Sequence, residues 1–190
     1  MIKVIWDVDG VLWDINDYIY KKLGIESEYS KRIHYKVELM GYSKEVEREI
    51  VRLYGDKEVF ENVEFDDGVD EINKLELEGV CKSFIHSHNY TEEVAEIKRR
   101  RLTEKLVEIP KSRMRLDVLR GTEVVIKELE ESDVVVEDSL DNLINCKAKL
   151  KILIEQPYNI MEMSKKDYGI DVVKNVSEAV WKIREYASTK

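Results

Sequence analysis

The sequence predicts an α/β fold: a Rossmann-like parallel sheet with helices on both faces and a small helical cap inserted after the first strand. Three observations predict it. Short β-branched runs are almost continuously apolar, as strands covered on both faces must be. Amphipathic segments of helical period separate most of these runs. A long helical stretch without a strand signal follows the first run. We expect five or six mainly parallel strands, with apolar runs at residues 3–6, 80–85, 134–136 and 151–154.

The stretch after the first strand is expected to form the cap, over residues 14–62, on a core formed by residues 1–13 and 63–190. Three helical segments are predicted in it, and a glycine follows each last turn, which is a usual helix stop. The cap tyrosines either stack on a substrate base or pack the short helices together. The helical segments are 14–23, 30–40 and 43–54, and the tyrosines are Tyr18, Tyr20, Tyr29, Tyr35, Tyr42 and Tyr54.

Three further helices are predicted between the later strands, at residues 70–78, 89–101 and 122–131. Asn89 and Glu92 have capping-box spacing at the start of the second. The basic run at residues 98–101 is expected to face solvent, and an anion-contacting patch is the alternative. Residues 112–131 allow two interpretations. They form one helix, or residues 113–119 form a strand, because polar and apolar residues alternate there.

Composition narrows the function classes. The chain has 190 residues and a formal net charge of −9, so we expect one domain with a small insertion and no nucleic-acid partner, which would require a basic face. No apolar stretch is long enough for a transmembrane helix, and the first residues lack a signal-peptide cleavage site. We therefore expect a cytoplasmic protein without a membrane partner, in which Cys81 and Cys146 are reduced core residues. The oligomeric state is left open.

Asp7 and Asp9 follow the first apolar run, where Gly10 begins a turn. The carboxyl ends of parallel strands are where ligands bind in such sheets. Two carboxylates there attract a hard cation such as Mg²⁺. One of them can act as a nucleophile while the other transfers a proton.

Polar residues also follow two other predicted strands. Ser87 comes after the second strand, and the acidic pair Glu137 and Asp138 ends the run at residues 134–136, with Asn142 four residues after Asp138. Because each of these residues follows an apolar strand, all of them are expected to meet at one edge of the sheet.

These motifs resemble those of the haloacid dehalogenase (HAD) superfamily of phosphotransferases. Residues 7–11 resemble its first motif, Ser87 its second, and Asp138 with Asn142 its fourth. The resemblance implies Mg²⁺ held by Asp7, the backbone carbonyl of Asp9, and Asp138. It also implies that Asp7 is the nucleophile and Asp9 the acid and base. Phosphate or substrate is then bound by Gly10, Ser87, His88 and Asn89, and the site is supported by Glu137 and Asn142.

The superfamily's third motif is a cation, and the sequence leaves its position open. Lys111 fits if residues 112–131 form one helix, and Arg120 fits if residues 113–119 form a strand. We weigh these two equally. Lys127 is a third option, interpreted as part of a solvated helix face.

The resemblance implies a Mg²⁺-dependent phosphomonoesterase that acts on a small phosphorylated metabolite through an aspartyl phosphate. A weaker similarity of residues 151–159 to the cytosolic 5′(3′)-deoxyribonucleotidase-like branch adds a nucleotide as one substrate option. The alternatives are a phosphomutase and a binding protein without turnover. His86 and His88 share one face of their strand if it is regular. In the interpretation that we favour, His86 packs in the core and His88 lines the site. In the alternative, the two form a transition-metal pair.

Overall fold

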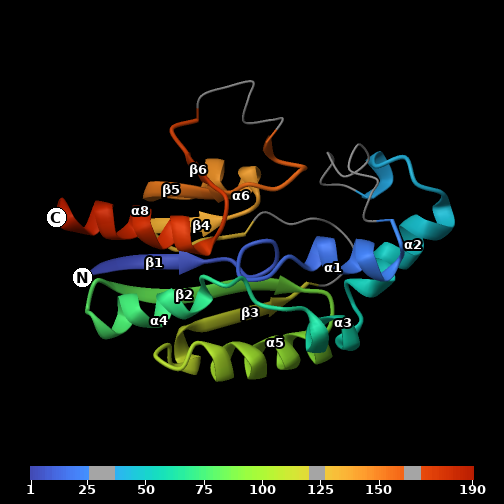
Figure 1. Cartoon of the computed structure of the whole chain (residues 1–190), viewed down its shortest axis with the longest axis horizontal. Helices are drawn as coiled ribbons and strands as arrows, with labels where there is room; N and C mark the ends of the chain where they lie inside the picture. The colour runs from blue at the N-terminus through green and yellow to red at the C-terminus, as the bar shows by residue number, and fades with distance from the viewer. Residues whose placement is uncertain (26–36, 120–126, 161–167) are drawn as a thin grey trace.

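The computed structural model describes residues 1–25, 37–119, 127–160 and 168–190 (Figure 1). Six parallel strands form one sheet in the order β3-β2-β1-β4-β5-β6. The predicted Rossmann-like α/β fold is confirmed. The strands are β1 (Ile2–Trp6), β2 (Cys81–Asn89), β3 (Met114–Val118), β4 (Ser132–Glu137), β5 (Ala148–Ile154) and β6 (Asp171–Val173).

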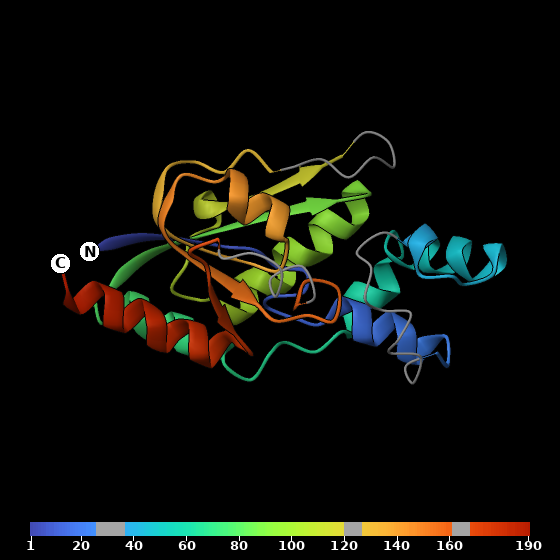
Figure 2. The same ribbon diagram turned by 90° about the horizontal axis from the view of Figure 1, so that it is seen from above.

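Helices cover both faces of this sheet. The larger core lies between one face and the helices α4 (Val69–Leu77), α5 (Glu92–Lys105) and α8 (Val176–Ser188). The helix α6 (Leu140–Asn145) packs on β4 and β5 from the other side, over a smaller cluster. Figure 2 shows α8 and α6 on opposite sides of the sheet. Alternate residues of β1 divide between the two cores, Val4 and Trp6 facing one and Ile5 the other, as strand geometry requires.

Between β1 and α4, the described elements of regular structure are helices joined by turns and irregular segments. This segment contains α1 (Ile15–Lys22), a 3₁₀ turn at Val37–Leu39, α2 (Lys44–Leu53) and α3 (Lys57–Asn62), and it lies beyond the carboxyl ends of the strands (Figure 1). The side chains of Asp14 and Ser43 cap α1 and α2, so the predicted helices 14–23 and 43–54 are confirmed. Most of the predicted helix 30–40 lies outside the described residues. The division into core and cap remains a prediction.

The strand β2 runs farther than predicted, and this moves the start of the next helix. Asn89 is the last residue of β2 rather than a helix cap. The N-cap of α5 is Thr91, whose hydroxyl accepts a hydrogen bond from the Val94 N–H at 3.2 Å. The predicted helix cap at Asn89 is therefore wrong by two residues.

The alternating segment after α5 is a strand. Residues Met114–Val118 form β3 at the edge of the sheet and pair with β2. A single helix over residues 112–131 is therefore wrong. Of the predicted helix 122–131, residues 122–126 lie outside the described residues, and residues 127–131 are not helical.

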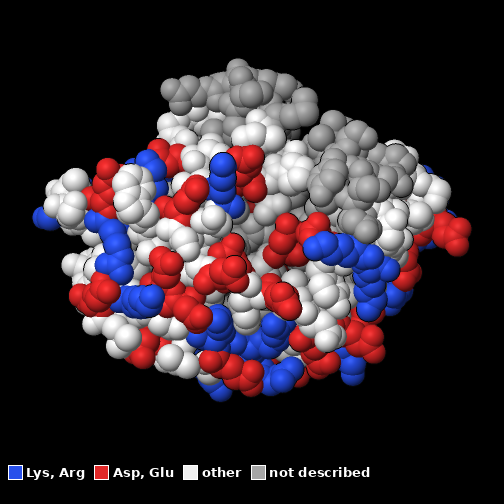
Figure 3. All heavy atoms as spheres, viewed as in Figure 1, with Lys and Arg blue, Asp and Glu red and all other residues white. Residues whose placement is uncertain are grey.

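Charge and burial bear on three other expectations. No described helix combines the length and the apolar character that a membrane span requires. On the face drawn in Figure 3, acidic and basic side chains are interspersed, and the absence of a nucleic-acid partner stays a prediction. Cys81 and Cys146 are both buried and free of disulfides.

Candidate active site

The turn after β1 brings the first-motif carboxylates to the carboxyl edge of the sheet. Asp7 continues the pairing of β1, because its N–H donates to the Val136 carbonyl at 2.9 Å. Gly10 then has a φ of +79°, and a Cβ at this position would collide with the Asp138 carboxylate. Both the positive φ and this close approach require glycine. The tight turn therefore places the ends of β1 and β4 side by side.

Asp7 is paired with a lysine. Lys127 Nζ lies 2.5 Å from Asp7 Oδ1 and 2.7 Å from Glu137 Oε1, and the three side chains are at most 8% exposed. Asn142 Nδ2 donates to Glu137 Oε1 at 2.9 Å, and the Lys127 N–H donates to Asn142 Oδ1 at 3.0 Å. Glu137 and Asn142 thus hold the lysine against Asp7. This cluster fixes a cation next to the predicted nucleophile.

Burial and like charges set the protonation of the acidic group. Burial, followed by the charge of Glu137, raises the pKa of Asp7 to about 7 despite the opposing effect of Lys127. Burial, with the charges of Asp7 and Glu137, raises the pKa of Asp138 well above its usual range. Burial alone would raise the pKa of Glu137, but Lys127 lowers it. More negative charge is gathered here than one lysine offsets.

The same group fits a divalent cation. Asp7, Glu137 and Asp138 each offer a carboxylate oxygen, and these atoms all lie within 4.8 Å of one another. Asp7 Oδ1 is buried, and among the described residues its polar contact is the ion pair with Lys127. Carboxylate oxygens that are crowded and raised in pKa are the donor set that Mg²⁺ binds.

Asp9 lies beside a second lysine. Lys98 Nζ, from α5, is buried against Asp9 Oδ2 and donates to Ser87 Oγ at 3.1 Å. The Trp13 Nε1–H donates to Asp9 Oδ1 at 2.7 Å. Burial lowers the pKa of Lys98, while the charge of Asp9 opposes this shift. The two oxygens of Asp9 are thus held by two different donors.

A later segment completes the site. The Tyr158 hydroxyl donates to Asp138 Oδ2, and Asn159 Nδ2 donates to the Asp138 carbonyl at 2.9 Å. Gln156 Nε2 donates to the Gly10 carbonyl at 3.0 Å. Residues 156–159 therefore tie the turn after β1 to the turn after β4.

Known structures share this arrangement of strands and helices. A HAD hydrolase of family IA from Entamoeba histolytica matches with a TM-score of 0.60 at 12% identity, covering 99% of this chain and 100% of that one. The chain has the fold of the haloacid dehalogenase-like hydrolases. The resemblance drawn from the motifs is thus confirmed at the level of the fold.

Other proteins with the HAD fold include enzymes that act on phosphate esters. A phosphoserine phosphatase, in a structure of a phospho-aspartyl intermediate analogue, matches with a TM-score of 0.51 at 19% identity, covering 95% of this chain and 97% of that one. A putative β-phosphoglucomutase from Bacteroides vulgatus matches with a TM-score of 0.52 at 11% identity, covering 100% of this chain and 91% of that one. No protein-family model and no curated protein sequence matches this chain.

The structure separates the three options for the HAD third-motif cation. Lys111 is exposed and precedes β3, at the amino end of the sheet, so its predicted position at the site is wrong. Arg120 lies outside the described residues. Lys127 is buried against Asp7 rather than on a solvated helix face, so that interpretation is also wrong.

For Lys98, the solvent-facing position expected of the basic run is wrong, and the lysine contacts the Asp9 carboxylate instead. Its side chain is 1% exposed. It lies on the buried stripe of α5 with Val94, Ala95 and Leu102. A lysine at a position where the helical period requires an apolar residue was the signal in the sequence.

The remaining predicted site residues divide between the two faces of β2. Ser87 is buried on the α5 side. His88 alternates with it and points to the other face, toward His86. Asn89 Nδ2 donates to the carbonyls of Ser87 and Asp117 at 3.4 and 3.2 Å. Binding of phosphate or substrate by these residues stays a prediction.

Four of the six tyrosines in the predicted cap lie in the described residues, and Tyr18 is partly buried against the core. Tyr20 and Tyr42 are buried in the core, which favours packing. Tyr54 lies on the Tyr90 ring, with centroids 6.1 Å apart, and burial followed by the charge of Asp9 raises the pKa of Tyr90. The Tyr54–Tyr90 pair is therefore an aromatic surface close enough to Asp9 to feel its charge. Tyr29 and Tyr35 lie outside the described residues.

Proposed function

We propose that this protein is a Mg²⁺-dependent phosphomonoester hydrolase that acts on a small phosphorylated metabolite through an aspartyl phosphate on Asp7. The observation that carries the proposal is the ion pair between Lys127 and Asp7 at the carboxyl edge of a HAD-type sheet. A buried carboxylate with a fixed cation beside it is an arrangement suited to phosphoryl transfer, in which positioning and charge stabilisation dominate.

The covalent step begins at Asp7. One of its carboxylate oxygens attacks phosphorus, the bond to the leaving oxygen breaks, and Asp9 supplies the proton that this oxygen takes up. Lys98 and Ser87 donate hydrogen bonds to the phosphoryl oxygens, and Lys127 offsets the charge that develops beside Asp7. Asp9 then accepts a proton from the water that hydrolyses the aspartyl phosphate. Phosphate leaves and Asp7 is regenerated.

Asp7, Asp138 and the backbone carbonyl of Asp9 would hold Mg²⁺, which supplies further neutralisation of the phosphoryl charge. Tyr158 orients Asp138 through its hydrogen bond to Oδ2. Glu137 is engaged by Lys127 and Asn142, so we assign it the role of holding the lysine.

Release of phosphate from 4-nitrophenyl phosphate, with Mg²⁺ and with EDTA, tests the proposal. We expect turnover with Mg²⁺, loss of turnover in EDTA and recovery when Mg²⁺ is restored. Asp7→Asn should abolish turnover, while Asp67→Asn, which changes an exposed aspartate, should not. Full turnover in EDTA, or an unchanged rate for Asp7→Asn, would contradict the proposal. Circular dichroism of each variant checks that it is folded.

A further inference from the structure

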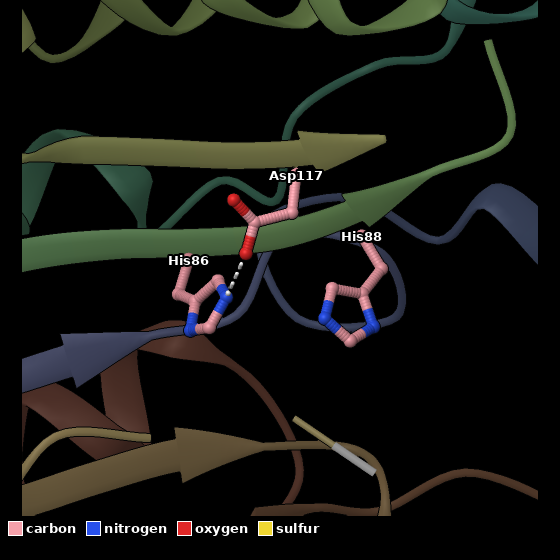
Figure 4. Close-up of side chains that lie close together, drawn as sticks. All are labelled: His86, His88 and Asp117. Carbon is pink, nitrogen blue, oxygen red and sulfur yellow. Dashed lines mark hydrogen bonds and ion pairs between the residues drawn. The ribbon is translucent and has the colours of Figure 1, made fainter. Parts of the chain in front are cut away.

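A second group of side chains with metal-ligand chemistry lies on β2 and β3. His86 and His88 are two residues apart on β2, and Asp117 is the register partner of His88 on β3. Alternate residues of a strand, and register partners of a parallel pair, share one face of a sheet. Figure 4 shows both rings on the same side of β2, with the Asp117 carboxylate reaching across from β3 to His86.

The distances suit a single ion. His86 Nε2 lies 3.2 Å from Asp117 Oδ2. Two ligands bound at about 2.0–2.1 Å to a tetrahedral ion lie about 3.3 Å apart, so this pair already has the separation of one edge of such a site. A ring nitrogen of His88 completes the set, because one ligand atom from each of the three residues lies within 4.8 Å of the others. A shift of at most about 1.5 Å at His88 would therefore close the site.

Burial and charge favour this use of the residues. The His86 side chain is 7% exposed and that of Asp117 is 35% exposed, so one side of the group is open to solvent and can admit an ion with a water ligand. Burial, with the charge of Lys127, lowers the pKa of both histidines, that of His88 to about 4. Both rings are therefore neutral at pH 7, the state in which imidazole binds metals.

Two cations near the group do not exclude an ion. Lys127 is already paired with Asp7 and Glu137. Arg115 Nε lies 2.7 Å from Asp117 Oδ2, and its side chain is 52% exposed. Arg115 can therefore turn into solvent when an ion takes its place, and it competes with that ion for the carboxylate.

We propose that His86, His88 and Asp117 form a binding site for a divalent transition ion such as Zn²⁺, separate from the acidic group at Asp7. Two imidazoles and one carboxylate are a donor set for zinc and related ions, whereas Mg²⁺ prefers oxygen ligands. The ion would join the edge strand β3 to β2. The proposal does not depend on phosphatase activity.

Equilibrium dialysis of the full chain against Zn²⁺, in excess Mg²⁺, tests this site. We expect one Zn²⁺ per chain in the wild type and in Asp138→Asn, because Asp138 belongs to the acidic group. His88→Gln and Asp117→Asn should weaken Zn²⁺ binding tenfold or more, and Asp70→Asn, at an exposed position on α4, should leave it unchanged. Arg115→Gln should tighten binding, because it removes the competing cation.

His86→Gln should weaken Zn²⁺ binding as His88→Gln does. The gain expected for Arg115→Gln cannot come from a damaged fold, so this variant still tests the site if a histidine variant does not fold. Co²⁺ in place of Zn²⁺ gives a second readout, the visible absorption of four-coordinate cobalt, which we expect in the wild type and not in His88→Gln. Absence of Zn²⁺ from the wild type would overturn the proposal. So would loss of Zn²⁺ from Asp138→Asn together with retention in His86→Gln and His88→Gln.

Discussion

Lys127 Nζ lies 2.5 Å from Asp7 Oδ1, and both side chains are less than one-tenth exposed. The lysine reaches Asp7 from the segment that precedes β4, the strand paired with β1. Burial would lower the pKa of Lys127, but Asp7 and Glu137 raise it instead. The ammonium group is therefore charged at any working pH and stands where negative charge develops in the proposed reaction.

Replacing Lys127 by methionine should lower kcat by on the order of a hundredfold or more, because a preorganised charge stabiliser is lost. Lys111→Met is the matched control and should keep the wild-type rate, since Lys111 is exposed at the other end of the sheet. Steady-state kinetics with 4-nitrophenyl phosphate checks both variants. A normal rate for a folded Lys127→Met would remove Lys127 from the mechanism.

An experiment that traps the phosphoenzyme should distinguish the roles of the two aspartates of the first motif. Asp7→Asn removes the nucleophile and should lower the rate by roughly ten thousandfold. Asp9→Asn removes proton transfer, which contributes a factor of about 10² to 10⁴ to the rate. A good leaving group needs little protonation, so some phosphoenzyme should still form. Its hydrolysis lacks the base, so it should accumulate. Intact mass spectrometry after an acid quench should find one added phosphoryl group on Asp9→Asn only. An adduct on both variants, or at a residue other than Asp7, contradicts the assignment.

Gly10 can be tested against a glycine of the same conformation. Gly10 and Gly41 have φ values of +79° and +72°, but only Gly10 lies against the Asp138 carboxylate. No atom of the described residues lies within 4 Å of a Cβ placed at Gly41. Both substitutions by alanine carry the cost of a left-handed residue, about 1 kcal/mol. Only Gly10→Ala should also weaken Mg²⁺-dependent activity and shift the melting temperature further. If Gly10→Ala and Gly41→Ala have equal effects on the melting temperature and on the rate, the structure accommodates the added Cβ at Gly10 without moving Asp138.

The sequence predicted the carboxylates but not the lysines, for a physical reason. Asp7 and Asp138 follow buried strands directly, so the parallel sheet alone brings them together. Lys127 lies in a segment without regular structure, and its burial depends on Glu137 and Asn142, which no local pattern connects to it. Tyr158 reaches Asp138 from 20 residues away, a contact made only in the folded chain.

The buried thiol of Cys81 should make the free energy of unfolding depend on pH. Burial raises the pKa of this thiol from 9.0 to about 11. The folded state therefore holds the thiol proton more tightly than the unfolded state, and the free energy of unfolding should fall as pH rises from 9 toward 11. The slope is at most about 1.4 kcal/mol per pH unit. Urea denaturation of the wild type and Cys81→Ala should diverge in this window and not at pH 7. Parallel pH profiles would show that the thiol does not ionise on unfolding.

The position of Lys98 beside Ser87 predicts that this lysine binds phosphate. Lys98 is buried on α5, contacts Asp9 and lies 3.1 Å from Ser87 Oγ, so a bound phosphoryl group would meet its charge directly. A hydrogen bond to a charged group contributes about 1.5–3 kcal/mol, or roughly ten- to a hundredfold in binding. Lys98→Met should therefore raise the inhibition constant of inorganic phosphate by that factor and lower kcat/KM at least as much.

The control for Lys98 comes from the same helix. Arg100 is exposed on α5, 3.7 Å from Glu61, and Arg100→Met should change neither the inhibition constant nor kcat/KM. If Lys98 only holds Asp9 in place, Lys98→Met should lower kcat while the inhibition constant of phosphate stays at its wild-type value. That split would assign Lys98 to positioning of the acid, because a loss of phosphate affinity requires direct contact between the lysine and the anion.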